Sequence, residues 1–256
     1  MLKVRIIPTL LWKNFGLVKG VGFDSWRRVG SVLPAIKVYN QREVDELILV
    51  DIVAHEGKES LDIEAVKEFG EECFVPLTVG GGIHNISQVS SLLRSGADKV
   101  TVNTTAFERP ELIGDIASRF GSQCVVASID VREISPRKWS CFSHAGRLNT
   151  GNDPVSWAQH LESLGAGEIL LTSINRDGTM RGYDLDLISA VTSAVNIPVI
   201  ASGGAGHYAH MVEAVTRAGA AAVAAASMFH FTEQTPAEAK EFMSEAGIPV
   251  RARFFD

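Results

Sequence analysis

The sequence predicts a single (β/α)8 barrel, an α/β fold in which eight parallel strands close into a cylinder inside a layer of helices. Short β-branched runs alternate with stretches of helical period along the whole chain, which is the pattern of buried parallel strands joined by helical crossovers. The chain has 256 residues, of which 46% are hydrophobic, and barrels of this kind commonly form one domain of that length. We therefore expect one barrel domain over residues 1–256.

Eight apolar runs, most of them closed by Gly, Asn, Asp or Ser, are the expected strands. The first lies in the stretch RIIPTLLWKNFG, from Arg5 to Gly16, and breaks into a loop; its last inward position is Leu11. No linker separates one strand–helix unit from the next, which favours a closed barrel over an open sheet. The eight runs are VRIIPTL (4–10), ELILVDI (46–52), VPLTVGG (75–81), KVTVNT (99–104), CVVASID (124–130), EILLTSI (168–174), IPVIASGG (197–204) and AAVAAAS (221–227).

The two halves of the chain repeat each other. ELILVDI matches EILLTSI, and PLTVGGG matches PVIASGG, both at an offset of 122 positions. GADKVTVNT then matches GAAAVAAAS at an offset of 123. A constant offset through three consecutive units predicts a duplicated half-barrel, with halves at about 1–120 and 121–256. In this repeat Leu11 is the counterpart of Asp130.

The composition argues against several classes of protein. A net charge of −6 and a pI near 5.7 disfavour a surface that binds nucleic acid. Three cysteines without CxxC spacing indicate neither a disulfide framework nor a zinc site, and they fit a reducing compartment. The N-terminus lacks the pattern of a signal peptide, and no apolar run approaches the ~20 residues of a membrane span. We expect a cytoplasmic protein without a membrane segment or a cofactor.

The histidines do not indicate a metal site. His207 and His210 have helical spacing, but neither has an acidic partner nearby in the sequence. A metal site needs several such ligands together. We therefore interpret both as solvated or capping side chains and predict no bound metal.

Two glycine turns follow equivalent strands, Gly80–Gly82 after the third and Ser202–Gly204 after the seventh. The next strand after each turn ends in a pair of small residues, Asn103–Thr104 in the first half and Ala226–Ser227 in the second. Bare glycine backbone lets peptide N–H groups approach an anion, and a helix N-terminus adds its dipole. A tight turn is the commoner use of a glycine pair, but equivalent placement beside a hydroxyl favours two phosphate sites. Such sites suit an elongated substrate with a phosphate at each end.

Carboxylates end several strands at the rim where barrels of this kind bind ligands. Asp51 ends the second strand, Asp130 ends the fifth, and NRDGT (175–179) follows the sixth. Asp130 lies in strand context, and partial burial would tune its pKa for general acid or base chemistry. For Asp177, within the turn-like RDG, a helix cap or loop hydrogen bond is the stronger interpretation.

Four charged residues begin strands at the opposite end of the barrel. Each lies an even number of positions before an inward rim residue, so period-2 alternation points it into the barrel from below. Lone buried charges are costly, and on spacing alone we interpret the four as a salt-bridged plug that closes the floor. They are Arg5, Glu46, Lys99 and Glu168.

Eight motifs lie in order along nearly the whole chain: RIIP, LVKG, DELILVDI, TVGGGIH, GADKVTVNT, GEILLTSINRDGT, IASGGAG and MFHF. Together they resemble the cyclase subunit of imidazole glycerol phosphate synthase. The resemblance implies a (β/α)8 barrel that binds a glutaminase partner at its floor and passes ammonia through the barrel to the rim. There the ammonia reacts with an aminoimidazole precursor carrying two phosphates, and the products are imidazole glycerol phosphate and an aminoimidazole carboxamide ribotide.

The resemblance also implies roles for single residues. The four charged residues at the floor match an ammonia gate in residue type, which replaces their interpretation as a plug. Asp98 matches a residue that docks the glutaminase, and Lys19 matches a lysine on a mobile loop. The remaining matches are to phosphate-binding and substrate-binding positions: Gly81, Gly82, Asn103, Thr104, Asp177, Gly178, Gly203, Gly204 and Ser227.

The sequence departs from this family at the catalytic centre. The family uses two aspartates, and Asp130 matches the second, but Leu11 stands at the first. Leucine can neither donate nor accept a proton, and loss of one of two cooperating groups costs orders of magnitude in rate. The bulky Trp12 follows this position, and Ala145 replaces a serine in the hairpin after the fifth strand. The mouth thus differs from the family while the floor matches it.

Three hypotheses follow. In the first, the chain resembles a divergent branch from surface-polysaccharide (O-antigen) gene clusters, where a glutaminase and a cyclase-like barrel supply ammonia to a third enzyme that converts an N-acetylated sugar to an acetamidino sugar. In the second, it is a working cyclase of histidine biosynthesis with Asp130 acting alone or with a substitute group. In the third, it is a regulatory barrel that only activates the glutaminase. Leu11 favours the first, the phosphate turns favour the second, and the matching gate disfavours the third.

Overall fold

The chain folds into a closed barrel of eight parallel strands, as the computed structural model shows for residues 2–13, 16–53 and 61–251. Each strand pairs with two neighbours, and the last pairs with the first. The predicted (β/α)8 fold is therefore confirmed. The barrel strands are β1 (Arg5–Lys13), β4 (Leu47–Asp51), β5 (Leu77–Gly80), β6 (Lys99–Val102), β7 (Val125–Ser135), β10 (Glu168–Ser173), β11 (Val199–Ser202) and β12 (Ala222–Ala225).

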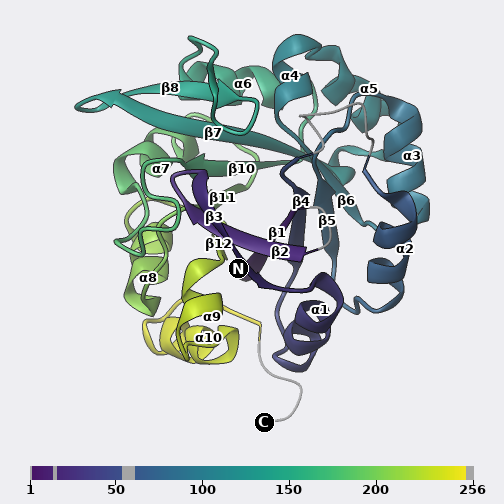
Figure 1. Cartoon of the computed structure of the whole chain (residues 1–256). Helices are drawn as coiled ribbons and strands as arrows, with labels where there is room; N and C mark the ends of the chain where they lie inside the picture. The colour runs from purple at the N-terminus through teal and green to yellow at the C-terminus, as the bar shows by residue number, and fades with distance from the viewer. Residues whose placement is uncertain (1, 14–15, 54–60, 252–256) are drawn as a thin grey trace.

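Helices surround the barrel on all sides (Figure 1). None of those in the described ranges has the length and apolar character that crossing a membrane requires. The helices are α1 (Val32–Gln41), α2 (Ile63–Glu71), α3 (Ile86–Arg94), α4 (Thr104–Glu108), α5 (Glu111–Phe120), the 3-10 turn η1 (Ser122–Cys124), α6 (Pro154–Ser163), α7 (Leu185–Thr192), α8 (Tyr208–Thr216), α9 (Ser227–Phe231) and α10 (Pro236–Glu245).

Helix α3 shows how the sequence sets these elements. The Asn85 side chain accepts a hydrogen bond from the Gln88 N–H at 3.0 Å, and the Gln88 side chain accepts one from the Asn85 N–H at 3.2 Å. This capping box satisfies two backbone donors at the start of the helix. Val89 and Leu92 then lie on one face and are fully buried against the barrel, so local capping and tertiary packing agree.

The apolar side chains of the strands are divided between two cores. One lies between the strands and the helices, and the other fills the inside of the barrel. Successive side chains of a strand point to opposite faces, so each strand contributes to both cores. The inner core, called here the inner apolar layer, consists of Ile7, Ile48, Val126, Leu170, Ile200, Ala222 and Ala224.

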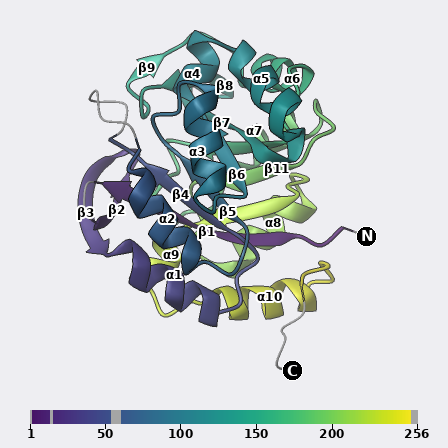
Figure 2. The same cartoon turned by 90° about the vertical axis from the view of Figure 1, so that its right-hand side faces the viewer.

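The first and fifth barrel strands each continue into a hairpin above the barrel. β1 pairs with β2 (Gly16–Val21), which pairs with β3 (Asp24–Gly30). β7 pairs with β8 (Lys138–Ser143), which pairs with β9 (Leu148–Asn149). The hairpins lie at the carboxyl ends of the strands, called here the mouth, and Figure 2 shows the N-terminus at the opposite end, the floor.

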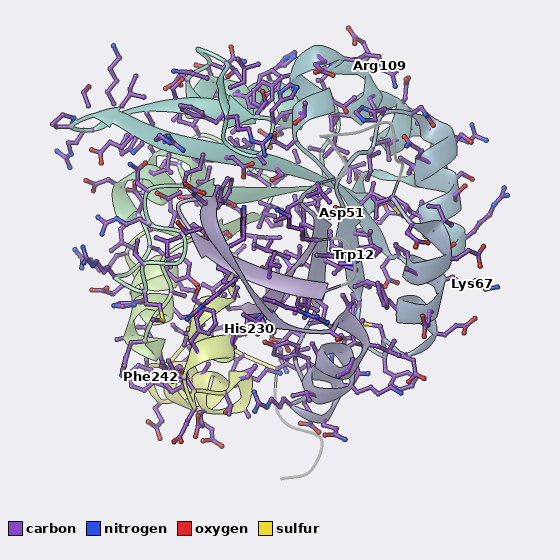
Figure 3. The ribbon with its side chains drawn as sticks, viewed as in Figure 1. Trp12, Asp51, Lys67, Arg109, His230 and Phe242 are labelled. Carbon is purple, nitrogen blue, oxygen red and sulfur yellow. The ribbon has the colours of Figure 1, made fainter. Side chains whose placement is uncertain are left out.

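The sequence did not predict the first hairpin. A loop was expected after Leu11, but β1 runs on to Lys13 and pairs antiparallel with β2, with Leu11 opposite Val18. Beyond the barrel rim the backbone of β1 needs new hydrogen-bond partners, and β2 supplies them. Trp12 faces outward, where its ring meets that of Phe69 edge-on at 5.4 Å. The bulky side chain next to Leu11 therefore lies outside the mouth; Figure 3 labels it beside the strands.

Candidate functional site

A cavity of about 170 Å³ opens at the mouth. Each of the eight barrel strands, or the loop that follows it, contributes to its wall. Apart from Trp12, the structure thus brings together the residues that the sequence singled out at the mouth. These residues are Leu11, Lys19, Asp51, Gly81, Gly82, Asn103, Thr104, Asp130, Ala145, Asp177, Gly178, Gly203, Gly204 and Ser227.

Leu11 occupies in β1 the position that Asp130 occupies in β7. Leu11 is paired with Val50 on the next strand, and Asp130 is paired with Thr172. Val50 and Thr172 are themselves related by the repeat offset of 122 positions. One carboxyl and one isobutyl group therefore face the same cavity from equivalent places, so only one of the two positions offers an acid–base group.

The Asp130 carboxyl is tuned for proton exchange near neutral pH. Burial in the mouth raises its pKa, and the negative charge of Asp177 raises it further, to about 7. Within the described chain no side chain donates a hydrogen bond to this carboxyl. A carboxyl with such a pKa can act as a general acid or a general base. The acid–base role of Asp130 stays a prediction.

Lys19 and Asp177 join the first hairpin to the rim. The Lys19 Nζ lies 2.6 and 2.8 Å from the two carboxylate oxygens of Asp177. The side chains are only 3% and 12% exposed, so this is a buried ion pair. The Gly22 N–H also donates to the Asp177 carbonyl at 2.9 Å. Lys19 thus lies on strand β2 instead of a loop, and the Asp177 carboxylate binds this lysine instead of capping a helix.

The first hairpin brings two aromatic side chains to the cavity that sequence analysis missed. Phe23 and Trp26 both line the mouth. Phe23 lies in the turn between β2 and β3 with a φ of 66°, and the Gly22–Phe23 pair makes this tight turn possible. The glycine-rich string GVGFDSW was the available signal for the turn.

The first glycine turn is fixed by a close backbone approach. Gly81 has a φ of 107°, and a Cβ there would collide with the carbonyl of Asp51. The neighbouring polar pair fastens the second hairpin: the Asn103 Nδ2 donates to the Phe142 carbonyl of β8 at 3.4 Å, and the Thr104 Oγ1 accepts from the His144 N–H at 3.0 Å. The Thr104 hydroxyl in turn donates to the Asn103 Oδ1 at 3.5 Å.

The second glycine turn repeats this geometry with a different hydroxyl. Gly203 has a φ of 87°, and a Cβ there would lie 2.6 Å from the Ser173 carbonyl oxygen. The Ser227 Oγ is buried, lines the cavity and has no hydrogen-bond partner in the part of the chain that the structure describes. A buried hydroxyl of this kind is normally satisfied, and an anion at the turn would satisfy it.

The second hairpin contributes little acid–base chemistry to the mouth. Ala145, which stands where the resemblance implies a serine, lines the cavity with a φ of 53°. Its neighbour His144 is tied through its backbone to Thr104, and its ring lies 3.6 Å from the Glu108 carboxylate. A methyl group at position 145 leaves this part of the wall apolar.

The four charged residues at the floor form a closed ring of ion pairs, called here the charged ring. The Arg5 Nη1 lies 2.7 Å from Glu46 and 2.9 Å from Glu168. The Lys99 Nζ lies 3.1 Å from Glu46 and 3.2 Å from Glu168. Burial lowers the pKa of Arg5, but attraction by Glu168 and Glu46 outweighs it and leaves the pKa above its ordinary value. Each acid therefore contacts both bases, as strand parity predicted.

Asp98 lies beside this ring on the outer surface of the floor. It is exposed, and one carboxylate oxygen accepts a hydrogen bond from the Leu77 N–H at 2.8 Å. Phe74 and Leu2, which are 80% and 92% exposed, lie near the starts of β5 and β1 at the same end. The docking role that the resemblance implies for Asp98 stays a prediction.

A comparison with protein families supports the resemblance. A family model described as "Histidine biosynthesis protein" matches residues 5–235. The match begins at the first residue of β1 and includes all eight barrel strands and the mouth described above. Such coverage comprises the fold and the candidate site together, and the chain therefore belongs to the histidine biosynthesis protein family of barrel enzymes.

Proposed function

We propose that this chain is the barrel subunit of a glutamine amidotransferase. It receives ammonia from a glutaminase partner at its floor and releases the ammonia at its mouth. There a third enzyme uses it to convert an N-acetylated sugar to an acetamidino sugar during the synthesis of surface polysaccharide. Family membership supports an enzyme of this general type, and the charged ring is the single observation that carries the proposal.

The charged ring is a poor stabilising device. Replacing buried ion pairs by apolar side chains of similar volume is often neutral or stabilising. Two acids and two bases at the base of the barrel interior, with side chains at most 21% exposed, are therefore better explained by passage of a small polar molecule. Separation of one pair would open a polar entrance directly beneath the inner apolar layer.

Leu11 favours use of the ammonia by a third enzyme over cyclisation at the mouth of this barrel. Cyclisation by the family pairs two carboxylates across the mouth, and here Asp130 faces an isobutyl group. One general acid or base typically raises a reaction rate about 100-fold to 10,000-fold. Leucine at position 11 cannot supply this contribution. Ammonia delivery needs no such pair, so the substitution is compatible with a conduit.

An active cyclase is the second candidate function. The two glycine turns and the unpartnered Ser227 hydroxyl favour it, because a pure conduit has no need of phosphate sites. The raised pKa of Asp130, about 7, would also let one carboxyl serve as acid and base in turn. In the amidation proposal the same turns would bind a phosphorylated part of the sugar substrate.

The proposal is tested by complex formation with the glutaminase. Purified chain would be mixed with a glutaminase subunit from the same organism, and association and glutamine hydrolysis would be measured. We expect a one-to-one complex and faster hydrolysis than by the glutaminase alone. Asp98→Lys should prevent the complex, since it reverses a charge on the docking face.

The matched control is Asp115→Lys, the same charge reversal at an exposed position of α5. This variant should associate as the unmodified chain does. Absence of any complex, or loss of the complex in both variants, would contradict the amidotransferase proposal.

A further inference from the structure

Side chains at equivalent helix positions hold the backbone after the two glycine turns. After the first turn, the His84 N–H donates to the Gln88 Oε1 at 2.8 Å. After the second turn, the Gly206 N–H donates to the His210 Nδ1 at 3.2 Å. The two donors are 122 positions apart, as are the two acceptors, and this is the repeat offset of the halves. Gln88 of α3 and His210 of α8 are therefore counterparts, on opposite sides of the barrel (Figure 1).

A second hydrogen bond holds the carbonyl of each of these residues. Arg109, directly after α4, donates to the His84 carbonyl at 2.8 Å, and Gln234, after α9, donates to the Gly206 carbonyl at 2.9 Å. Gly206 is also closely packed, since a Cβ there would lie 2.1 Å from the Met180 carbonyl oxygen. The backbone that leaves each glycine turn is thus fixed through both its N–H and its carbonyl group.

Two histidines take the place of the capping box of α3. His207 is the N-cap of α8, where its Nδ1 accepts from the Ala209 N–H at 3.2 Å, and its counterpart in α3 is the N-cap Asn85. His210 is the third residue of α8, as Gln88 is the third residue of α3. The two halves therefore share one arrangement, with amide oxygens as acceptors in the first and imidazole nitrogens in the second.

This exchange makes the acceptor in the second half titratable. An amide oxygen accepts a hydrogen bond at any ordinary pH, whereas an imidazole nitrogen accepts only while it carries no proton. Burial lowers the pKa of His210 below the ordinary 6.5; attraction by Glu213 opposes this shift, and the nearby His207 adds to it. The loop after β10 packs against the ring with the backbone of Gly182, next to the exposed Arg181. His210 is therefore neutral at neutral pH, with its proton on Nε2.

We propose that His210 is a positioning residue for anion binding at the second glycine turn and that it acts only in its neutral form. Protonation would turn the Nδ1–H towards the Gly206 N–H, which would lose its acceptor and release the backbone from Gly203 to Gly206. The buried Ser227 hydroxyl, which lines the cavity and lacks a partner among the described residues, supports an anion at this turn. The inference rests on the phosphate turn that both candidate functions use.

The test is a sulfate titration of the purified full-length chain, labelled with ¹⁵N at its glycines and kept at constant ionic strength. Sulfate keeps its double charge from about pH 5 to about pH 8, so a change in affinity with pH belongs to the protein. The amide signals of Gly82 and Gly204 report binding at the two turns separately. We expect the affinity at the second turn to fall about fivefold to tenfold as the pH falls through the pKa of His210, because one positioning hydrogen bond is lost.

His210→Gln supplies the acceptor that Gln88 supplies in the first half. At about pH 8 this variant should bind sulfate at the second turn as tightly as the unmodified chain, and it should not lose affinity on acidification. His210→Ala should have the weaker affinity at every pH. Asp130 and the other titrating groups of the mouth are present in all of these chains, so the comparison with His210→Gln isolates the imidazole.

Gln88→Ala is the matched control, because it removes the equivalent acceptor from the first turn. It should weaken sulfate binding reported by Gly82 and leave binding reported by Gly204 unchanged. The same loss on acidification in the unmodified chain and in His210→Gln would overturn the proposal. Absence of sulfate binding at Gly204, or tighter binding by the unmodified chain than by His210→Gln at acidic pH, would overturn it as well.

The outcome is separable from that of the proposed function. Neither a glutaminase nor an acceptor substrate is present in the titration. Failure of the imidazole effect would remove the role of His210 and leave the complex-formation test untouched. Failure of complex formation with a preserved imidazole effect would instead remove the partner and keep the histidine-held anion turn.

Discussion

The half of the barrel that begins with β1 and the half that begins with β7 share a frame and differ at the mouth. Each half has a first strand that extends into a hairpin, a glycine turn after its third strand, and a short helix, α4 or α9, after its fourth. Gly81 and Gly203 even pack against carbonyls at equivalent positions. Yet the equivalent positions at the mouth carry an apolar side chain, Leu11, in one half and an acidic side chain, Asp130, in the other.

The hairpins differ in the same way. The first is joined to the rim by a buried ion pair between Lys19 and Asp177. The second is joined by neutral hydrogen bonds from Asn103 and to Thr104. Backbone constraints are therefore common to both halves, whereas side chains at the mouth have changed independently. The side chains at the mouth can therefore change while the strands, glycine turns and hairpins that hold them stay the same.

Removal of Lys19 should have the largest effect on stability. Lys19→Met leaves the Asp177 carboxylate buried without its cation, which should cost about 4 kcal/mol of unfolding free energy. Urea unfolding at neutral pH measures this loss. The double variant Lys19→Met, Asp177→Asn should recover part of it, because no uncompensated charge remains. A double variant less stable than the single would show that the ion pair is not what fastens this hairpin.

The glycine turns test whether the two halves share their frame. Gly81→Ala and Gly203→Ala should each lower the unfolding free energy by about 2–3 kcal/mol, since φ is positive and the added methyl meets a carbonyl. The Gly81 variant should be affected more because its carbonyl is nearer. Gly30→Ala is the control, as nothing lies within 4 Å of an added Cβ there. Equal stability of all three variants would contradict the shared frame.

Asp130 should make stability depend on pH. Its pKa in the folded chain, about 7, lies above the ordinary 3.8, so its contribution is full below pH ~4 and is lost as the pH rises through 7. Asp130→Asn should therefore be about 2 kcal/mol more stable than the unmodified chain at pH 8, with the difference vanishing towards pH 4. Unfolding curves across this range measure it, with the exposed Asp186→Asn as control. A difference that grows on acidification would contradict the raised pKa.

The second hairpin should be the less sensitive one. Thr104→Val removes the acceptor of the His144 N–H and should cost about 1 kcal/mol. The same unfolding experiment compares it directly with Lys19→Met. If the threonine variant lost as much stability as the lysine variant, the two hairpins would not differ in how they are fastened.

Sequence patterns could predict the barrel because burial repeats with the period of the strands. The same period placed the charged ring, since Arg5 and Glu46 are inward by parity alone. The first hairpin could not be predicted in this way: its pairing depends on Lys19 meeting Asp177, 158 positions away. That the buried Ser227 hydroxyl has no hydrogen-bond partner among the described residues also depends on packing at the mouth, which no local pattern records.

The most direct measurement is cyclisation by the purified chain, supplied with ammonium salt and the bisphosphorylated aminoimidazole precursor. Leu11→Asp would be measured beside it, and Leu11→Asp combined with Asp130→Asn would control for the restored pair. Ammonia delivery predicts no turnover by the unmodified chain and turnover in Leu11→Asp alone. Turnover by the unmodified chain at a rate that supports growth would contradict it and make Asp130 sufficient for the chemistry.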